Sequence, residues 1–218
     1  MEKYSDLKEQ FITSMSIKIQ EFASQIKDQF NQISTDRKEK LMPLVNYVRE
    51  KHQLKEEISL VFICTHNSRR SHFGQIMCAF AATYYGISNV HTFSAGTEKT
   101  AFHPHAIEAL KTIGFKVERL DQSPNPHYRI HVSESVHSDC FSKTISHESL
   151  PKNHFAAIMT CSDAEQNCPV VPGAEERIGI TYEDPKAYDG TALQSSKYME
   201  RATQIATELF YVFSQLNA

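Results

Sequence analysis

Hydrophobic positions in the first 56 residues recur every three or four residues, as they do along one face of a helix. The first stripe predicts one long amphipathic helix and consists of Leu7, Phe11, Met15, Ile19, Phe22, Ile26, Phe30 and Ile33. A second helical pattern follows Thr35 or Asp36, and its apolar side is formed by Leu41, Leu44, Val45 and Val48. Because proline lacks a backbone N–H, this helix is expected to begin late or to kink at Pro43.

Residues 1–56 are therefore interpreted as a helical hairpin that precedes a main domain at 57–218. Two helices alone bury little surface, so their stripes are expected to pack on each other and on a further surface. That surface is either the main domain or a second copy of the chain, and the second case would make the protein a homodimer. The segment contains no Gly and no Cys, and the simplest interpretation gives it a packing role without chemistry.

From residue 57 onward, apolar runs that predict buried strands alternate with periodic segments that predict helices. The expected strands are 58–63, 90–94, 155–160 and 177–181. The expected helices are 71–85, 104–113 and about 195–215. This alternation predicts an α/β domain with a small, doubly wound, parallel four-stranded sheet and helices on both faces. In such a sheet the ligand lies outside the carboxyl ends of the strands.

The segment 119–153 does not follow this alternation. It is rich in Ser, His and Pro, and residues 128–132 alternate like an exposed strand. We interpret it as an insertion with a short edge strand.

Composition limits the classes of function. Of the 218 residues, 40% are hydrophobic and 22% are charged, which is typical of a globular protein. The net charge of −3 argues against a general nucleic-acid-binding protein. The chain has no apolar run long enough to cross a membrane and no signal-like segment, so a cytoplasmic protein is expected. The number of cysteines, five, is odd, which does not fit a disulfide framework and leaves packed, reactive or metal-binding thiols.

Chemistry is indicated where the first strand of the main domain ends. This strand runs into Cys64, five residues separate Cys64 from Arg70, and a helix follows. The backbone N–H groups of such a loop can surround a tetrahedral anion, and the start of the helix adds partial positive charge. The planar guanidinium of Arg70 can hold two oxygens. The expected oxyanion-binding residues are Thr65, His66, Asn67, Ser68, Arg69, Arg70 and Ser71.

In this electropositive environment Cys64 is expected to be a thiolate and the nucleophile. Ser71 can donate a hydrogen bond to its sulfur, and Asn67 can adopt a left-handed turn. Taken alone, Cys64 would fit a buried cysteine at the end of a strand. Its combination with Arg70, Ser71 and the strand–loop–helix context favours an enzyme that acts on phosphate-like oxyanions.

The arrangement of Cys64, Arg70 and Ser71 after a strand resembles the low-molecular-weight protein tyrosine phosphatase superfamily, which includes the thioredoxin-coupled arsenate reductases. Residues 93–97 and 105–110 are similar to the segments that follow in both groups. The resemblance covers about residues 58–218 and leaves 1–56 unexplained.

In this superfamily an Asp-Pro loop supplies the general acid, and the resemblance assigns that role to Asp184. Pro185 keeps Asp184 out of helical geometry, which suits a carboxylate that points into a pocket. The alternative is an ordinary turn carboxylate beside proline. Glu183 and Asp189 are weaker candidates for the acid.

Residues 159–169 resemble the arsenate reductases in particular, because they contain Cys161, Cys168 and the Ser-Asp-Ala between them. By this resemblance Cys161 would attack the sulfur of Cys64, Cys168 would then attack Cys161, and a thioredoxin-like reductant would reopen the last disulfide. No bound cofactor is implied. If the residues after Cys161 are helical, this segment must loop out to form the Cys161–Cys168 bond. The alternatives are two packed thiols or a zinc site, although the spacing is not usual for zinc.

Four positions depart from the family pattern. His66 stands where glycine is usual, and Arg69 adds a charge that would either face solvent or attract an anionic substrate. Gln75 stands where many of these arsenate reductases have an acid of a potassium site, so no metal site is expected. Tyr188 comes later than the aromatic residues that phosphatases place directly after the Pro.

Two functions therefore remain in order of preference. The first is arsenate reduction by a three-cysteine relay, and the second is hydrolysis of phosphate monoesters through a phosphocysteine. Both use Cys64, Arg70 and Asp184, whereas reduction alone needs Cys161 and Cys168. A third alternative is a non-catalytic module that senses oxyanions or binds a partner through its helices.

Overall fold

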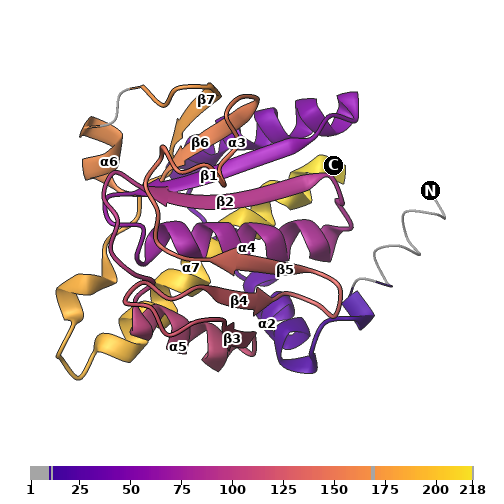
Figure 1. The fold of residues 1–218 in the computed structure, drawn as a ribbon. Coiled ribbons are helices and arrows are strands. Elements are labelled where there is room, and N and C mark those ends of the chain that lie inside the picture. Colours follow the sequence, from indigo (N-terminus) through magenta and orange to yellow (C-terminus); the bar gives the residue numbers. More distant parts are fainter. Residues whose placement is uncertain (1–9, 11, 168–169, 218) are drawn as a thin grey trace.

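The computed structural model of the protein describes residues 10, 12–167 and 170–217. Four parallel strands form its central sheet in the order β2-β1-β6-β7 (Figure 1). They are β1 (Ile58–Cys64), β2 (Val90–Gly96), β6 (Phe155–Met159) and β7 (Ala174–Gly179). The parallel α/β sheet predicted from the alternating pattern is thus confirmed. Its register pairs Cys64 with Gly96, which brings these two strand ends together at the carboxyl edge of the sheet.

Helices and loops cover the two faces of this sheet. The α-helices are α2 (Ile17–Lys27), α3 (Thr35–Leu54), α4 (Arg70–Tyr85), α5 (Pro104–Ile113), α6 (Ser162–Asn167) and α7 (Gln194–Ser214). Because side chains alternate along a strand, Leu60 and Phe62 join the large core beneath α4 and α7, whereas Val61 and Ile63 join a smaller cluster. This smaller cluster is covered by α6 and by loops.

A second, antiparallel sheet occupies much of the expected insertion. It consists of β3 (Lys116–Arg119), β4 (Tyr128–His131) and β5 (His137–Cys140), with β4 in the centre. The prediction of an edge strand at this place was therefore wrong. The middle position follows from burial, since Ile130 of β4 belongs to the large core and its strand is paired on both sides.

The N-terminal stripe is not one continuous helix. Ser16 has an extended backbone at the N-cap of α2, a position that serine favours, and the helical geometry is interrupted there. Phe30–Gln32 forms a separate 3₁₀ turn after α2. Leu7 and Phe11 of the predicted stripe lie outside the described residues.

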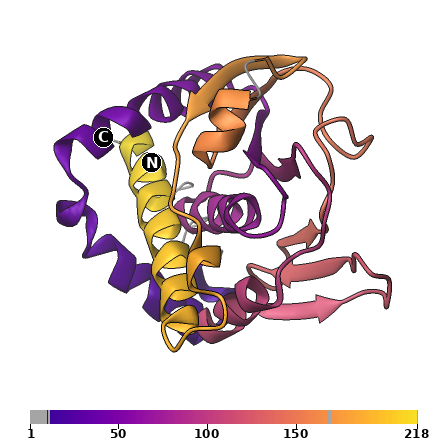
Figure 2. The ribbon, with the colours of Figure 1, turned by 90° about the vertical axis from the view of Figure 1, so that its left-hand side faces the viewer.

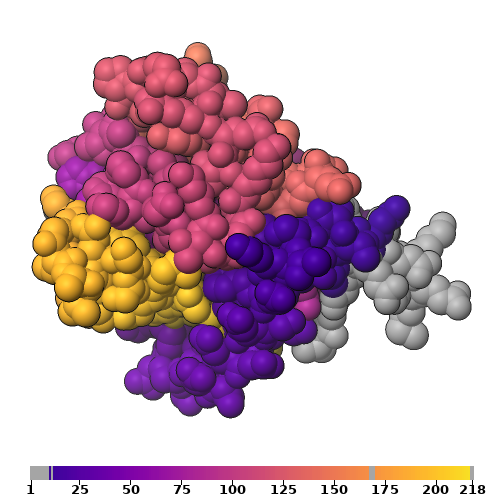
Figure 3. Space-filling model, turned by 90° about the horizontal axis from the view of Figure 1, so that it is seen from below, coloured from indigo at the N-terminus to yellow at the C-terminus, as the bar shows by residue number. Residues whose placement is uncertain are grey.

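The second N-terminal helix, α3, begins at Thr35 and runs through Pro43, which excludes a late start, the first of the two alternatives predicted from proline. The reason lies in the cap: the Ser34 hydroxyl accepts a hydrogen bond from the Arg37 N–H at 3.2 Å. Both N-terminal helices contact α7, and their apolar side chains belong to the same core as the main domain. Figures 2 and 3 show this segment, in indigo and purple, against the yellow C-terminal helix.

No helix of the described residues is both long and apolar enough to span a membrane.

Candidate active site

The loop from Cys64 to Arg70 joins β1 to α4 at the carboxyl edge of the sheet. Asn67 has a positive φ of 43°, the left-handed turn expected of it. A β-carbon at Gly96 would lie 2.7 Å from both the Asn67 nitrogen and the Thr65 oxygen. The close passage of β2 behind the loop therefore requires glycine at this position.

The carbonyl oxygens of the loop are tied to neighbouring segments. The Glu98 N–H donates to the Thr65 oxygen at 2.8 Å, and the hydroxyls of Thr100 and Ser142 donate to the His66 oxygen at 2.9 and 3.0 Å. Since the carbonyls are directed toward protein donors, the backbone N–H groups are the part of the loop left to bind an anion.

A chain of hydrogen bonds leads from Cys64, the candidate nucleophile, to Lys143 in the segment predicted as an insertion. The Cys64 sulfur lies 3.1 Å from the Ser71 hydroxyl, which in turn accepts from the Asn67 amide at 2.8 Å. The Asn67 side-chain oxygen accepts from the Lys143 backbone N–H at 2.8 Å. Either atom can donate in the Cys64–Ser71 contact, but a Cys64 thiolate can only accept, and the Ser71 hydroxyl would then be the donor.

Arg70 lies where its guanidinium can reach an anion held by the loop. Its Nη1 donates to the Tyr182 oxygen at 2.9 Å, and its Nη2 pairs with the Asp184 carboxylate at 2.5 Å. Its Nε is buried and has no hydrogen-bond partner among the described residues. A buried donor without an acceptor costs free energy of folding. Arg70 is therefore suited to bind an oxyanion, which could accept a hydrogen bond from its Nε.

Asp184 is held at the entrance to the 3₁₀ turn Pro185–Tyr188, where its second oxygen accepts from the Lys186 N–H at 3.0 Å. The two weaker acid candidates lie elsewhere. Glu183 is 86% exposed beside Arg201, and Asp189 accepts from Arg69.

Arg69 does not face solvent, since its side chain is 10% exposed. Of the two predicted alternatives, only the attraction of an anionic substrate remains. Its Nε donates to the Tyr198 hydroxyl at 2.6 Å, and its Nη2 donates to Asp189 at 3.0 Å. Burial opposes the charge on Asp189, but hydrogen bonding to Tyr198 and the charge of Arg69 lower its pKa overall. Burial, and then the charge of Arg69, lower the pKa of the neighbouring His103 to about 4, so this imidazole is neutral at pH 7. Through its hydrogen bond to Tyr198, Arg69 ties the loop to α7.

His66 is the most exposed side chain of the loop that carries a basic group. It lies 3.4 Å from the Glu98 carboxylate and is 41% exposed.

Cys161 is buried directly beside the loop. Its sulfur lies 3.5 Å from the Thr65 hydroxyl and accepts from the Ala164 N–H at 3.4 Å in the first turn of α6. Cys64 and Cys161 belong to the same apolar cluster. Cys168 lies outside the described residues.

The two other thiols are packed. Burial raises the pKa of Cys78, as expected for a core position in α4, and raises that of Cys140 to about 12. No group of three His, Cys, Asp or Glu side chains in the described part of the chain could hold a metal ion. Gln75 instead accepts from Ser94 and donates to the Asp139 carbonyl.

Several residues that build the site were not identified from the sequence. Ser142 and Lys143 of the insertion support the loop, and Tyr198 of α7 supports Arg69. Nothing in the local sequence indicates these contacts, because each joins segments that are distant along the chain.

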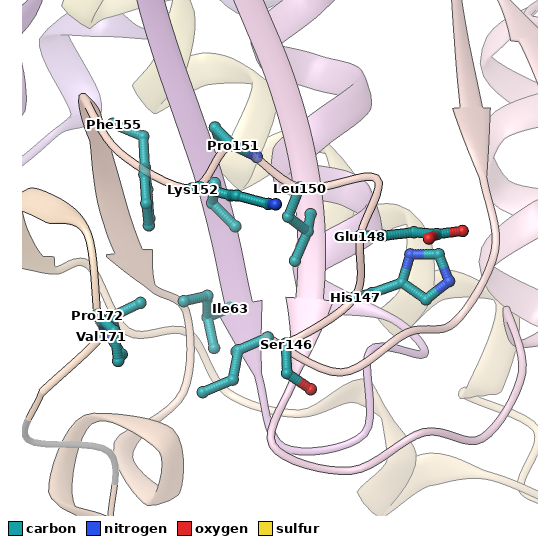
Figure 4. A pocket seen from close by; sticks show the side chains of 12 residues that line it. Ile63, Ser146, His147, Glu148, Leu150, Pro151, Lys152, Phe155, Val171 and Pro172 are labelled. Carbon is teal, nitrogen blue, oxygen red and sulfur yellow. The ribbon is translucent and has the colours of Figure 1, made fainter.

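A separate hollow of about 240 Å³ lies on the face of the sheet that α6 covers (Figure 4). Apolar side chains such as Ile63, Leu150 and Val171 line it, together with the polar side chains of Ser146, His147, Glu148 and Lys152. Neither Cys64 nor Arg70 lines this hollow, so it is separate from the candidate oxyanion site.

Comparison with known proteins adds an independent finding. Residues 59–132 match the model of the low molecular weight phosphotyrosine protein phosphatase family. The arsenate reductase 1 of Staphylococcus epidermidis is 28% identical over 136 residues, which cover 62% of this chain and 84% of that protein. The arsenate reductase of Halalkalibacterium halodurans is 30% identical over 132 residues, which cover 61% and 77% of the two chains. A solved structure of an arsenate reductase in the phosphate-binding state is 21% identical, with a TM-score of 0.45 over 73% of this chain and 98% of that one.

Proposed function

The chain belongs to the low-molecular-weight phosphotyrosine protein phosphatase family, and we propose that within this family it reduces arsenate to arsenite with Cys64 as the nucleophile. The observation that carries the proposal is the place of Cys161, whose buried sulfur lies 3.5 Å from the Thr65 hydroxyl of the nucleophile loop. A phosphatase needs a single thiol. A second thiol beside the loop is what a reductase of this kind requires.

The proposed reaction begins when the loop N–H groups and Arg70 bind arsenate. The Cys64 thiolate attacks arsenic and displaces one oxygen, which leaves as water after protonation. Asp184 is the candidate proton donor, since its carboxyl group lies beside Arg70. The product is a covalent Cys64–arsenic(V) adduct.

Reduction follows by attack of the Cys161 thiolate on the Cys64 sulfur. The sulfur–arsenic bond breaks and its electron pair stays on arsenic, which leaves as arsenite, while Cys64 and Cys161 become a disulfide. Cys168 then attacks the Cys161 sulfur and releases the Cys64 thiolate. An external dithiol of the thioredoxin type supplies the two electrons that reduce the Cys161–Cys168 bond.

The proposal is tested by arsenate-dependent consumption of NADPH in the presence of thioredoxin and thioredoxin reductase. We expect turnover by the wild-type chain, and no sustained turnover by Cys161→Ser or Cys168→Ser. Cys140→Ala, which removes a buried thiol outside the proposed relay, is the matched control and should retain turnover. Equal turnover by all four proteins would refute the relay.

Hydrolysis of phosphate monoesters is the second candidate. The Arg70–Asp184 pair favours it, because an arginine that holds the phosphoryl group and an acid that protonates the departing oxygen are what the reaction needs. Hydrolysis of para-nitrophenyl phosphate by the same four proteins separates the functions. Robust hydrolysis without arsenate reduction, unaffected by either serine substitution, would assign the chain to the phosphatases.

A further inference from the structure

Arg37 lies in the first turn of α3, outside the residues that match the family model. Its backbone is placed by the Ser34 cap, and its side chain extends to α7. There Nε and Nη2 donate to the two oxygens of Glu208 at 2.9 and 2.8 Å. The two parallel hydrogen bonds hold the guanidinium plane in one orientation.

The Arg37–Glu208 ion pair is largely buried. Glu208 is 3% exposed, and a carboxylate so buried requires a partner. Burial works against the charge of Arg37, yet the hydrogen bonding with Glu208 raises its pKa overall. The N-terminal segment thus places a permanent cation at the buried side of α7.

The same guanidinium lies over an aromatic ring. Its central carbon is 4.7 Å from the ring centroid of Tyr182, a distance typical of a cation–π contact. Tyr182 is buried and precedes Asp184 by two residues. Its carbonyl oxygen accepts from Arg70 Nη1 at 2.9 Å, so one residue contacts Arg37 with its ring and Arg70 with its backbone.

We infer that Arg37 is a positioning residue for the oxyanion site: it holds the Tyr182 ring, and the Tyr182 carbonyl orients the Arg70 guanidinium toward the anion. This inference rests on the proposed role of Arg70 as an oxyanion ligand. With Nη1 fixed by Tyr182, the Arg70 Nε remains a buried donor without a partner among the described residues. The N-terminal helices therefore contribute to anion binding without touching the anion.

Binding of inorganic phosphate to the full chain, measured by titration calorimetry, tests the inference. We expect Arg37→Met to raise the Kd of phosphate about fivefold, in line with coupling through packed contacts. Arg37→Lys, which keeps a cation over the ring, should restore part of the affinity. Because Arg37→Met removes the cation that pairs with the buried Glu208, the double variant Arg37→Met, Glu208→Gln is measured as well and should show the same loss.

Arg49→Met is the matched control, since Arg49 lies on the same helix and donates to the Gln215 carbonyl at 3.0 Å. It should lower the Tm without changing the Kd of phosphate. Wild-type affinity in both Arg37→Met proteins would overturn the inference and leave the proposed function intact. A wild-type chain that neither binds phosphate nor turns over an oxyanion would overturn both.

Discussion

At the scale of single residues, the site depends on how Arg70 divides its hydrogen bonds. One Nη holds the Tyr182 carbonyl and the other holds the Asp184 carboxylate. An arriving oxyanion therefore competes with Asp184 for the same cation. In the proposed mechanism, oxyanion binding and proton donation are therefore linked through this one ion pair.

The link predicts opposite effects of one substitution. Asp184→Asn removes a negative charge beside Arg70 and also removes the proposed proton donor. We expect it to bind inorganic phosphate more tightly than the wild type, while kcat for para-nitrophenyl phosphate falls about a hundredfold. Calorimetry and steady-state kinetics measure the two effects separately. Weaker phosphate binding by this variant would contradict the competition.

The residues of the loop were predictable from the sequence because they are contiguous. Cys64, Asn67, Arg70 and Ser71 follow a buried strand and precede a helix, and each has a side chain whose chemistry suits an oxyanion site. The contacts of Arg69 were not predictable, because Asp189 and Tyr198 come from a distant part of the chain. Their approach depends on how α7 packs against α4.

At the scale of elements, the hydrophobic periodicity and the residues at the helix ends explain most of the helices and strands that the sequence predicted. α5 spans Pro104–Ile113 as expected, since proline begins it and Gly114, at a φ of 117°, ends it. Two strands of the second sheet were missed because they are four residues long and their sequences, KVER in β3 and HSDC in β5, show no clear alternation of apolar and polar residues. The break at Ser16 was missed because the hydrophobic spacing continues across it.

The attachment of α3 to the edge of the central sheet should depend on pH. Glu175 of β7 accepts from His154 and from Lys51 and Tyr47 of α3. The hydrogen bond from His154, followed by that from Lys51, lowers the pKa of Glu175 from 4.5 to about 2, although burial opposes the shift. A depressed carboxyl pKa stabilises the fold above the unfolded value and loses this effect as the pH falls toward the folded value.

We therefore expect Glu175→Gln to melt below the wild type at pH 7, with a Tm difference that shrinks between about pH 5 and pH 3. Thermal unfolding followed by circular dichroism at several pH values measures this difference. The exposed neighbour Glu176→Gln is the matched control and should melt close to the wild type throughout. A Tm difference independent of pH would show that the effect is not electrostatic.

At the scale of the whole molecule, the N-terminal helices are part of the core. Phe22 of α2 stacks against Phe80 of α4, with ring centroids 6.3 Å apart, and Phe80 contacts Phe210 of α7. Each fully buried side chain of this size stabilises the fold by about 1.5–3 kcal/mol. The sequence predicted amphipathic helices but left open whether they pack on the main domain or on a second copy, because a stripe does not specify its partner. In the structure they pack on the main domain.

The insertion also joins the site to the rest of the molecule. Thr144 pairs with Gly96 beside β2, and Lys143 supports Asn67. The loop from Cys64 to Arg70 is thus held from the segment around Lys143 on one side and, through Tyr182 and Arg37, from the N-terminal helices on the other. We propose that the segment around Lys143 and the N-terminal helices both serve to hold this loop.

The most direct test of the account is to trap the first disulfide of the proposed relay. Cys168→Ser is treated with arsenate without any reductant, and its intact mass and peptide map are compared with those of a phosphate-treated sample. We predict a loss of about 2 Da and a peptide that links Cys64 to Cys161, formed with arsenate alone. The double variant Cys64→Ser, Cys168→Ser should form no such link. Cys168→Ser that remains fully reduced in arsenate would contradict the relay, and with it the assignment of this chain as an arsenate reductase.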